Sequence, residues 1–322
     1  MKFSLFVHME RWDESVSHRQ LFEDLTELTL MAEAGGFSTV WIGEHHSMEY
    51  TISPSPMPLL AYLAGKTTTI HLGAGTIIAP FWHPLRVAGE CALLDVISNG
   101  RMEVGLARGA YQIEFDRMAG GMPASSGGQA LREMVPVVRA LWNGDYAHDG
   151  DIWKFPTSTS VPKPIQQPNP PMWIAARDPD SHNFAVANGC NVMVTPLMKG
   201  DEEVLDLKNK FQAALDNNPG VPRPQLMVLR HTHVHTADDP EGWKVGPRRS
   251  RSSIAPSMPG SATRPPRSTA SLRRVRKRNS PDARVRTREP AQDRHDRHPG
   301  RNHSAHQVLP GTGRGRIQLL VR

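Results

Sequence analysis

The sequence has little cysteine and no long apolar run. Its 322 residues include two cysteines, Cys91 and Cys190. Two cysteines are too few for a disulfide framework, which predicts reduced thiols and a cytoplasmic protein. Charged residues Glu10 and Arg11 closely follow the first strand-like run, so we expect no secretory leader. An apolar stretch of about 20 residues is also missing, and we expect no membrane-spanning helix.

The last quarter of the chain contains no aromatic residue, since the final Trp, Tyr or Phe of the sequence is Trp243. Residues 246–322 carry 19 Lys and Arg against 4 Asp and Glu, a net of +15. Residues 1–245 carry 19 Lys and Arg against 28 Asp and Glu, a net charge of −9. A segment rich in Arg, Ser and Pro without aromatics buries too little apolar area to offset its ordering entropy. We therefore predict a folded domain over 1–245 and a basic, disordered tail over 246–322.

Three explanations for this tail stay open. It could be an arm that binds nucleic acid through phosphate contacts, although it lacks the aromatic side chains that stack on bases. It could be a solvated tail without a role. We favour a third explanation, in which the last quarter of the domain is read out of frame. The folded pattern stops abruptly near Trp243, and codons can be chosen for residues 299–311 so that a shifted frame encodes an amphipathic helix.

Strand-like apolar runs alternate with segments of helical periodicity. The strands are expected at 3–7, 39–42, 70–79, 102–107, 172–176, 191–195 and 225–235, and the helices at 21–32, 58–65, 85–97, 129–142, 178–188 and 204–215. This alternation indicates an α/β fold with a parallel sheet, either doubly wound or closed into a barrel. Seven strands are one short of a (β/α)8 TIM barrel. After residue 254 only 317–321 is strand-like, so we expect an incomplete eighth strand. If the tail is native, the sheet would then have open edges beside the first and seventh strands.

Three motifs resemble the bacterial-luciferase-like flavin-dependent monooxygenases, which include the alkanal monooxygenase alpha chains. Residues 39–46 read TVWIGEHH, and residues 94–101 read LDVISNGR and lead into GLARG at 105–109. Residues 161–173 contain VPKP, QP and PPMW. The motifs occur in the family's order and spacing, and the resemblance covers about residues 1–240.

The resemblance implies a luciferase-like TIM barrel and an oxidoreductase activity. Such an enzyme takes reduced FMN from a separate flavin reductase and uses O₂ to oxygenate a small organic substrate, such as an aldehyde, through a C4a-peroxyflavin. A homodimer is compatible with it. An F420-dependent dehydrogenase on the same barrel is the alternative cofactor assignment. No dinucleotide fingerprint occurs, which favours delivery of reduced flavin over binding of a nicotinamide cofactor.

The expected catalytic residue lies at the end of the second strand, and TIM barrels carry their chemistry at the carboxyl ends of the strands. Glu44, His45 and His46 follow that strand. Histidine titrates near neutral pH and suits proton transfer. The resemblance makes His45 the catalytic histidine and places Glu44 at the cofactor. A structural histidine at a strand end is the alternative.

Small residues at the end of the third strand suit a flat ring. Gly75 and Thr76 would let it approach the backbone closely. The resemblance implies contact with the isoalloxazine here and a non-proline cis peptide between these two residues. A glycine bulge within the strand is the alternative.

A phosphate site is expected at the ends of the fourth and fifth strands. A guanidinium at Arg108 binds phosphate well, and Asp178 and Ser181 begin a helix whose N-terminus favours anions. The resemblance assigns all three to cofactor binding, although the carboxylate of Asp178 opposes a phosphate. A second family arginine is replaced by Gln129, with Arg132 one turn later, and Ala107 replaces a cysteine of the luciferases.

No metal site is predicted. Adjacent residues on an extended strand point to opposite faces, which disfavours zinc at His45 and His46. His231, His233 and His235 alternate on the seventh expected strand and would share one face. Three ligands along one strand are spread too far apart, so we interpret them as a polar lining of the barrel mouth.

Overall fold

The computed structural model describes residues 1–11, 13–48, 51–196, 200–232 and 318–321. The predicted tail over 246–322 therefore lies outside the described residues except at 318–321. His233 and His235 lie outside them as well. In the described part of the chain, no helix combines the length and apolarity needed to span a bilayer.

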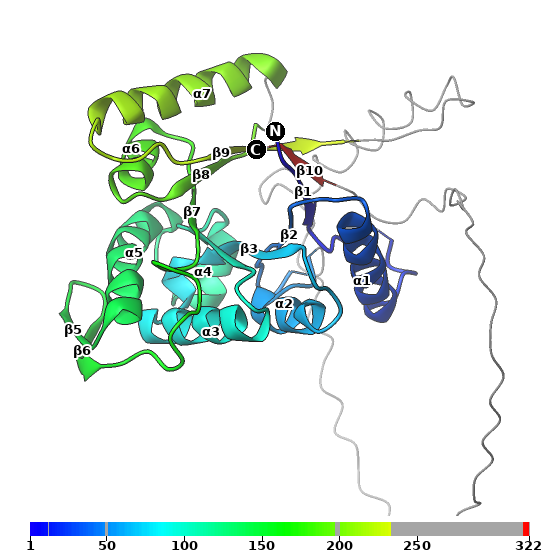
Figure 1. Ribbon diagram of the computed structural model, residues 1–322, viewed down its shortest axis with the longest axis horizontal. Helices are drawn as coiled ribbons and strands as arrows, with labels where there is room; N and C mark the ends of the chain where they lie inside the picture. The colour runs from blue at the N-terminus through cyan, green and yellow to red at the C-terminus, as the bar shows by residue number, and fades with distance from the viewer. Residues whose placement is uncertain (12, 49–50, 197–199, 233–317, 322) are drawn as a thin grey trace, which may run out of the picture. The chain divides into compact units, whose positions relative to one another are not determined.

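Eight strands form a closed barrel in the order β1-β10-β9-β8-β7-β4-β3-β2 (Figure 1). They are β1 (Phe3–Val7), β2 (Thr39–Ile42), β3 (His71–Ile78), β4 (Met102–Ala107), β7 (Met172–Ala175), β8 (Asn191–Val194), β9 (Leu226–His231) and β10 (Gln318–Val321). All neighbours from β1 through β9 pair in parallel. The seven parallel strands lie within the stretches expected from the sequence, and the barrel plan is confirmed.

The eighth strand differs from the expectation. The strand-like run at the end of the tail does enter the barrel, but β10 is antiparallel to both neighbours. Its register places Leu319 opposite Leu5 of β1 and opposite Arg230 of β9. The expected open edges beside the first and seventh strands are therefore wrong, because β10 pairs with the backbone of both. Pairing of this kind removes the unpaired N–H and C=O groups that make a sheet edge prone to aggregation.

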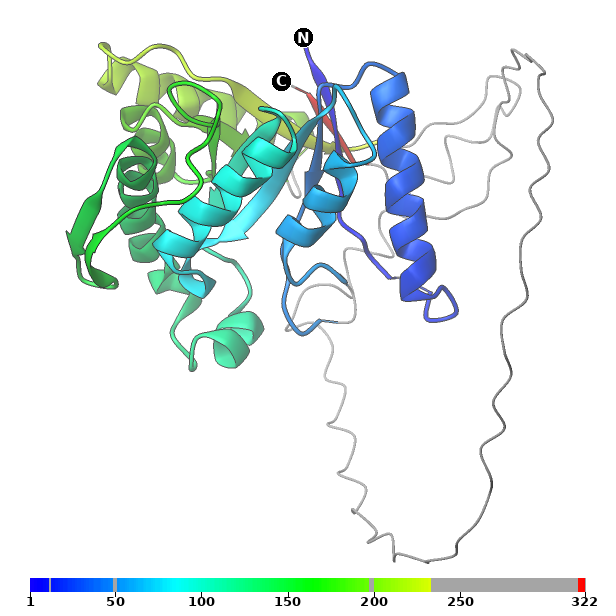
Figure 2. The same ribbon diagram turned by 60° about the horizontal axis from the view of Figure 1, so that its bottom comes forward.

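Helices pack around the barrel and connect its strands (Figures 1 and 2). They are α1 (His18–Ala34), α2 (Pro56–Ala64), α3 (Pro84–Ile97), α4 (Gln112–Met118), α5 (Gly127–Asn143), α6 (Pro179–Ala187) and α7 (Gly200–Asn217), with short 3₁₀ turns η1 (Ala79–Phe81) and η2 (Ala124–Ser126). The Ser17 hydroxyl caps α1 by accepting the Gln20 N–H. The sequence missed α4 and the hairpin of β5 (Tyr146–Asp149) and β6 (Lys154–Ser158).

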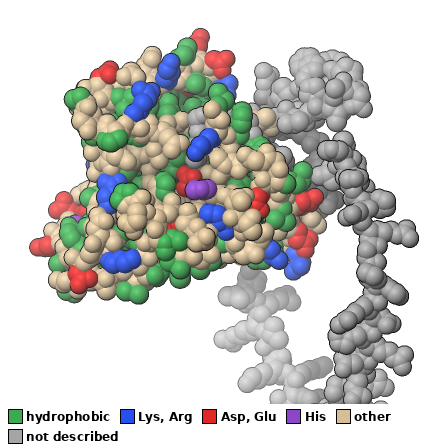
Figure 3. Space-filling model, viewed as in Figure 1, with side chains coloured by type: hydrophobic (Ala, Val, Ile, Leu, Met, Phe, Trp, Pro, Cys, Tyr) green, Lys and Arg blue, Asp and Glu red, His purple; other side chains and the backbone are tan. Residues whose placement is uncertain are grey.

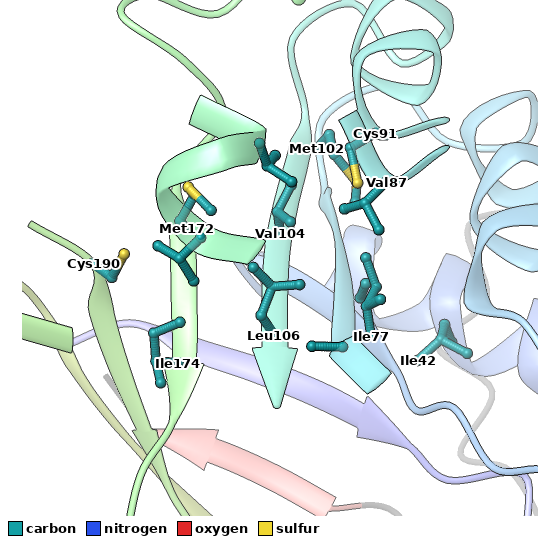
Figure 4. Packing of buried hydrophobic residues seen from close by; sticks show 14 of the residues in the cluster. Ile42, Ile77, Val87, Cys91, Met102, Val104, Leu106, Met172, Ile174 and Cys190 are labelled. Atoms are coloured by element: carbon teal, nitrogen blue, oxygen red, sulfur yellow. The ribbon is translucent and has the colours of Figure 1, made fainter. Parts of the chain in front are cut away.

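Alternation along each strand separates two cores. Side chains on the outer face pack between the sheet and the helices; Figure 4 shows Met102, Val104 and Leu106 along β4, beside Met172 and Ile174 of β7 and facing Val87 and Cys91 of α3. A second, smaller cluster fills the barrel interior with Phe6, Trp41, Trp173 and Met227. The rings of Trp41 and Trp173 meet edge to face at 5.6 Å. Parallel strands buried on both faces explain why these segments are so apolar.

Glycine makes room for these large rings. A Cβ at Gly73 would lie 2.3 Å from the Trp41 ring, so the indole occupies the space that any other side chain would need. A Cβ at Gly105 would lie 2.2 Å from the Ala74 carbonyl oxygen. The glycine pattern of strands three and four is therefore required by packing inside the barrel.

Polar groups close the amino-terminal end of the barrel. The buried Glu103 carboxylate accepts hydrogen bonds from the Trp173 indole N–H at 2.7 Å and from the Thr39 hydroxyl at 3.0 Å. His71 lies 3.3 Å from the same carboxylate. These contacts fix the interior tryptophan at the floor of the barrel.

The second motif that carries the family resemblance is structural in this chain. Asp95 of α3 is buried and accepts the backbone N–H groups of Ile165 and Gln166 at 2.8 and 2.9 Å. The buried Arg101 guanidinium donates to the carbonyl oxygens of Ala64, Thr67 and Ile70. The motif thus anchors α3 to the segment before β7 and to the loop before β3.

Acidic and basic side chains are interspersed over the face shown in Figure 3. The described residues on this face form no block of basic side chains there. The view therefore gives no support to a nucleic-acid groove on this side of the barrel.

Candidate functional site

Functional side chains gather where β1 to β4 end. His8 follows β1, Glu44, His45 and His46 follow β2, and Thr76 lies near the end of β3. Gly43 approaches β3 closely, since a Cβ on it would lie 3.5 Å from the Gly75 carbonyl oxygen. The strand ends after β2 and β3 therefore meet at the carboxyl end of the barrel, as the sequence predicted.

His45 is held by a buried carboxylate. Its Nδ1 lies 3.2 and 3.4 Å from the two carboxylate oxygens of Glu114 in α4. The backbone N–H of His45 donates to the Ser53 carbonyl oxygen at 2.8 Å. The His45 side chain is 14% exposed and that of Glu114 is 1% exposed. The histidine can therefore meet a ligand, whereas its partner is sealed from water.

Two aromatic rings flank the His45 imidazole. The His8 ring stacks on it at 5.1 Å with an interplanar angle of 29°. The Tyr111 ring lies 5.4 Å away on another side. His8 in turn contacts the Thr51 hydroxyl at 3.2 Å and lies 3.9 Å from Glu10. The site thus combines titratable groups with flat, polarisable surfaces.

Glu44 occupies the wall behind the site. Its side chain is fully buried, and both carboxylate oxygens accept the Trp82 indole N–H at 2.9 Å. It also accepts the backbone N–H of Ile78 at 3.1 Å and lies 2.5 Å from Nε2 of His46. A direct bond from Glu44 to a cofactor stays a prediction, and it would have to come from a carboxylate already in contact with three protein groups.

The end of β3 has the backbone geometry that the resemblance implied. The peptide bond between Gly75 and Thr76 is cis, and the pairing register of β3 with β4 shifts between Ala74 and Ile77. A Cβ on Gly75 would lie 2.9 Å from the Phe6 ring. This stretch therefore presents backbone rather than a bulky side chain at the site.

Arg108 lies at the end of β4 beside the start of α5. Its guanidinium is exposed and donates to the Ala124 carbonyl oxygen at 3.2 Å. A Cβ on Gly127, the first residue of α5, would lie 2.1 Å from the Arg108 carbonyl oxygen. No side chain caps the N-terminus of α5. A guanidinium and an uncapped helix start thus lie side by side, which favours an anion.

The two residues predicted to bind phosphate at α6, Asp178 and Ser181, are hydrogen-bonded to each other. The Asp178 carboxylate caps α6 by accepting the Ser181 N–H at 2.8 Å, and the Ser181 hydroxyl donates to the same carboxylate at 3.0 Å. Burial, the largest single influence, would raise the pKa of the Asp178 carboxyl. Hydrogen bonds from Ser181 and the charge of Arg132 outweigh it and lower that pKa below its usual value. A negative charge therefore already occupies the position that a phosphate would take.

Sequence reasoning missed Glu114, Tyr111 and His8. Glu114 and Tyr111 are three residues apart around the start of α4, and such a spacing places two side chains on one helix face. Detecting it would have required recognising the seven-residue α4.

His231 belongs to β9, and its two expected partners lie outside the described residues. Among the described residues, no group of three or more His, Cys, Asp or Glu side chains could hold a metal ion.

The chain is similar to known monooxygenases. The family of luciferase-like monooxygenases matches residues 1–316. The oxygenase component of the flavin-dependent trigonelline monooxygenase of Acinetobacter baylyi is 54% identical over 245 residues, covering 76% of this chain and 68% of that protein. The alkanal monooxygenase alpha chain of the Kryptophanaron alfredi symbiont is 26% identical, and this chain spans 59% of its length.

Solved structures show the same fold. The monooxygenase RslO1 of Streptomyces bottropensis has a TM-score of 0.71 at 28% identity, covering 80% of this chain and 79% of that one. An FMN complex of the oxygenating constituent of 3,6-diketocamphane monooxygenase from Pseudomonas putida has a TM-score of 0.63 at 19% identity and covers 70% and 66%. An F420-dependent secondary alcohol dehydrogenase has a TM-score of 0.59 at 19% identity and covers 70% and 68%. Together with the motifs and the barrel, these matches show that the chain belongs to the luciferase-like monooxygenase family.

Proposed function

We propose that the chain is the oxygenase component of a two-component monooxygenase that takes reduced FMN from a separate reductase and uses O₂ to oxygenate a small organic substrate. The observation that carries this proposal is the partly exposed His45, backed by the buried Glu114, beside the end of β3. The 54% identity to a flavin-dependent oxygenase component supports it.

The residues at the end of β3 fit the ring of a flavin. Gly75 has no side chain, and Gly75 and Thr76 are both half-buried, so this strand end is partly accessible. Carbonyl and N–H groups of such a stretch can bond to the ring edge, and Tyr111 and His8 offer flat surfaces nearby. When bound, reduced flavin would supply the electrons for oxygen transfer to the substrate, with the second oxygen atom leaving as water.

The phosphate would be held by Arg108 and the start of α5. The exposed guanidinium can form two parallel hydrogen bonds to a phosphate, and the positive end of the α5 helix dipole, which no side chain caps, favours the same charge. Ser181 would join only after turning away from Asp178, because its hydroxyl donates to that carboxylate. We therefore rank Arg108 above Ser181 and Asp178 as a phosphate ligand.

His45 would exchange a proton with the reacting groups. A histidine near neutral pH can both accept and donate a proton, which contributes roughly 10²–10⁴-fold to a rate. The buried carboxylate of Glu114 lies against Nδ1 and keeps water away from that side of the ring.

For the substrate, we propose a small heteroaromatic compound ahead of a straight-chain aldehyde. The rings of His8, His45 and Tyr111 lie together at the site and suit a flat molecule. A positively charged pyridinium ring would be attracted to the face of Tyr111. Trigonelline, which has such a ring, gives its name to the relative of 54% identity and is the first compound to test.

The test uses the full chain with a flavin reductase, NADH and FMN. We expect reduced FMN to bind and oxygen consumption to rise when trigonelline is added, with an aldehyde as the second candidate. An anaerobic assay of F420 reduction with an alcohol tests the dehydrogenase alternative, which the fold of the F420-dependent neighbour makes relevant. Failure to bind any flavin or deazaflavin would overturn the proposal.

A further inference from the structure

We infer that Glu114 is a positioning residue that sets the tautomer and orientation of His45. The inference rests on the proposed function, since it assigns a task to a residue of the same site. It stands on the hydrogen bonds, burial and packing of α4.

The hydrogen bonds determine which nitrogen carries the proton. An ionised carboxylate only accepts hydrogen bonds, so Nδ1 of His45 must donate to Glu114. In the neutral ring, Nε2 is then the acceptor nitrogen. Glu114 also accepts the backbone N–H of His46 at 2.7 Å. One carboxylate therefore fixes both the ring of His45 and the backbone beside it.

The neighbouring histidine has a different arrangement. Nε2 of His46 contacts Glu44, which is held in the wall by Trp82 and the Ile78 N–H. The ring of His46 packs edge to face on Phe81 at 5.3 Å. The two adjacent histidines thus each have their own carboxylate, and only the His45 pair lies against His8 and Tyr111.

Packing holds Glu114 in place. The next residue of α4, Phe115, is fully buried and meets Phe81 at 5.1 Å. Gly109 has a φ of +82° and a Cβ on it would lie 2.7 Å from the Phe115 ring, so the turn into α4 requires glycine. Arg117 at the end of α4 donates to the Ser47 carbonyl oxygen, which ties the helix to the segment after β2. A rigid helix therefore carries the carboxylate to a fixed point beside His45.

Three side chains face the His45 ring from different elements. Glu114 faces it from α4, Tyr111 from the residue before α4, and His8 from the end of β1, with Glu10 behind His8. Removing the Glu114 carboxylate removes the acceptor that faces Nδ1, so the ring loses the hydrogen bond that orients it.

The test compares wild type with Glu114→Gln and Glu114→Asp in the full chain. A glutamine can accept the His46 N–H with its oxygen and donate to Nδ1 with its amide, which would reverse the tautomer of His45. We expect Glu114→Gln to lower kcat by roughly 10²–10⁴-fold with KM changed much less, the range for general acid–base catalysis. Glu114→Asp keeps the carboxylate and should recover part of the activity.

Glu133→Gln is the matched control. Glu133 also pairs with a histidine, since His148 Nε2 lies 2.9 Å from it, and it also accepts backbone N–H groups, those of Ile152 and Trp153. It belongs to α5, and its partners lie in or beside the β5–β6 hairpin. We expect the kcat of Glu133→Gln and the tautomer of His45 in it to match wild type.

A second measurement needs no turnover. Nitrogen-15 NMR of the histidine rings, with the His45 signals assigned through His45→Gln, reports which nitrogen carries the proton. Protonated Nδ1 in wild type and protonated Nε2 in Glu114→Gln is the expected result. An unchanged tautomer of His45 in a folded Glu114→Gln variant would overturn the inference. A protein that shows the tautomer switch but no oxygenase activity would refute the proposed function alone.

Discussion

Replacing Glu44 with glutamine should destabilise the protein by about 2–5 kcal/mol. The fully buried carboxylate accepts hydrogen bonds from the Trp82 indole and the Ile78 N–H and contacts His46. In Glu44→Gln an amide nitrogen replaces one oxygen, so at least one buried N–H faces another donor. An unsatisfied buried group costs about 1–3 kcal/mol, and the lost charge-assisted contact with His46 adds about 1–2 kcal/mol.

Urea unfolding followed by tryptophan fluorescence measures this loss, with reduced-flavin binding measured in parallel. Glu23→Gln is the control, because Glu23 forms an exposed pair with Arg19 at 2.9 Å and should change the unfolding free energy by less than about 0.5 kcal/mol. If Glu44→Gln keeps the wild-type stability and loses flavin affinity instead, Glu44 is a cofactor ligand and the assignment to the wall is wrong.

Three further predictions concern stability. Gly105→Ala should lower the unfolding free energy by about 1–3 kcal/mol in urea, because the new Cβ would lie 2.2 Å from the Ala74 carbonyl oxygen; equal stability would show that β3 and β4 separate easily. At Glu33, burial is the largest influence and opposes ionisation, but the N–H groups of Thr68, Thr69 and Ile70 lower the pKa to about 2. The stability advantage of wild type over Glu33→Gln should therefore be complete above about pH 4.5 and disappear as the pH falls towards 2, and a constant difference across that range would contradict it. Burial also lowers the pKa of His182, so the unfolded chain binds the proton more readily than the folded chain does. Wild type should therefore lose stability as the pH falls below about 6.5. Urea midpoints at pH 7.5 and 5.5 measure this loss, and it should be smaller in His182→Gln.

The parallel part of the barrel could be predicted because its signals are local. Apolar runs, the glycines at 35 and 36, and the Asp178–Pro179 helix start all mark boundaries within a few residues of their position. The direction of β10 could not be predicted, because a four-residue apolar run gives no indication of whether its partners are parallel or antiparallel. The hairpin of β5 and β6 was missed because its short strands are half-exposed and β6 contains Pro156, so neither strand has a clear apolar alternation.

The site was predictable only in part. His45 and the Gly75–Thr76 strand end were located by motif, and the structure brings their strands together. Glu114 was missed because its role depends on a contact with a residue 69 positions earlier in the chain. Asp178 and Ser181 show the opposite limitation. A helix start that attracts a phosphate and one capped by its own carboxylate have similar sequences. The three-dimensional structure distinguishes them, because Asp178 accepts the Ser181 N–H.

The tryptophan pair at the floor of the barrel has a consequence for how ligands would enter and leave the barrel. Trp41 and Trp173 are fully buried across the axis, and Glu103 seals the layer beneath them. These described side chains fill the amino-terminal part of the barrel interior. Under the proposed function, we therefore expect reduced cofactor, oxygen, substrate and product to use the opposite end of the barrel, where cofactor and substrate would share one entrance.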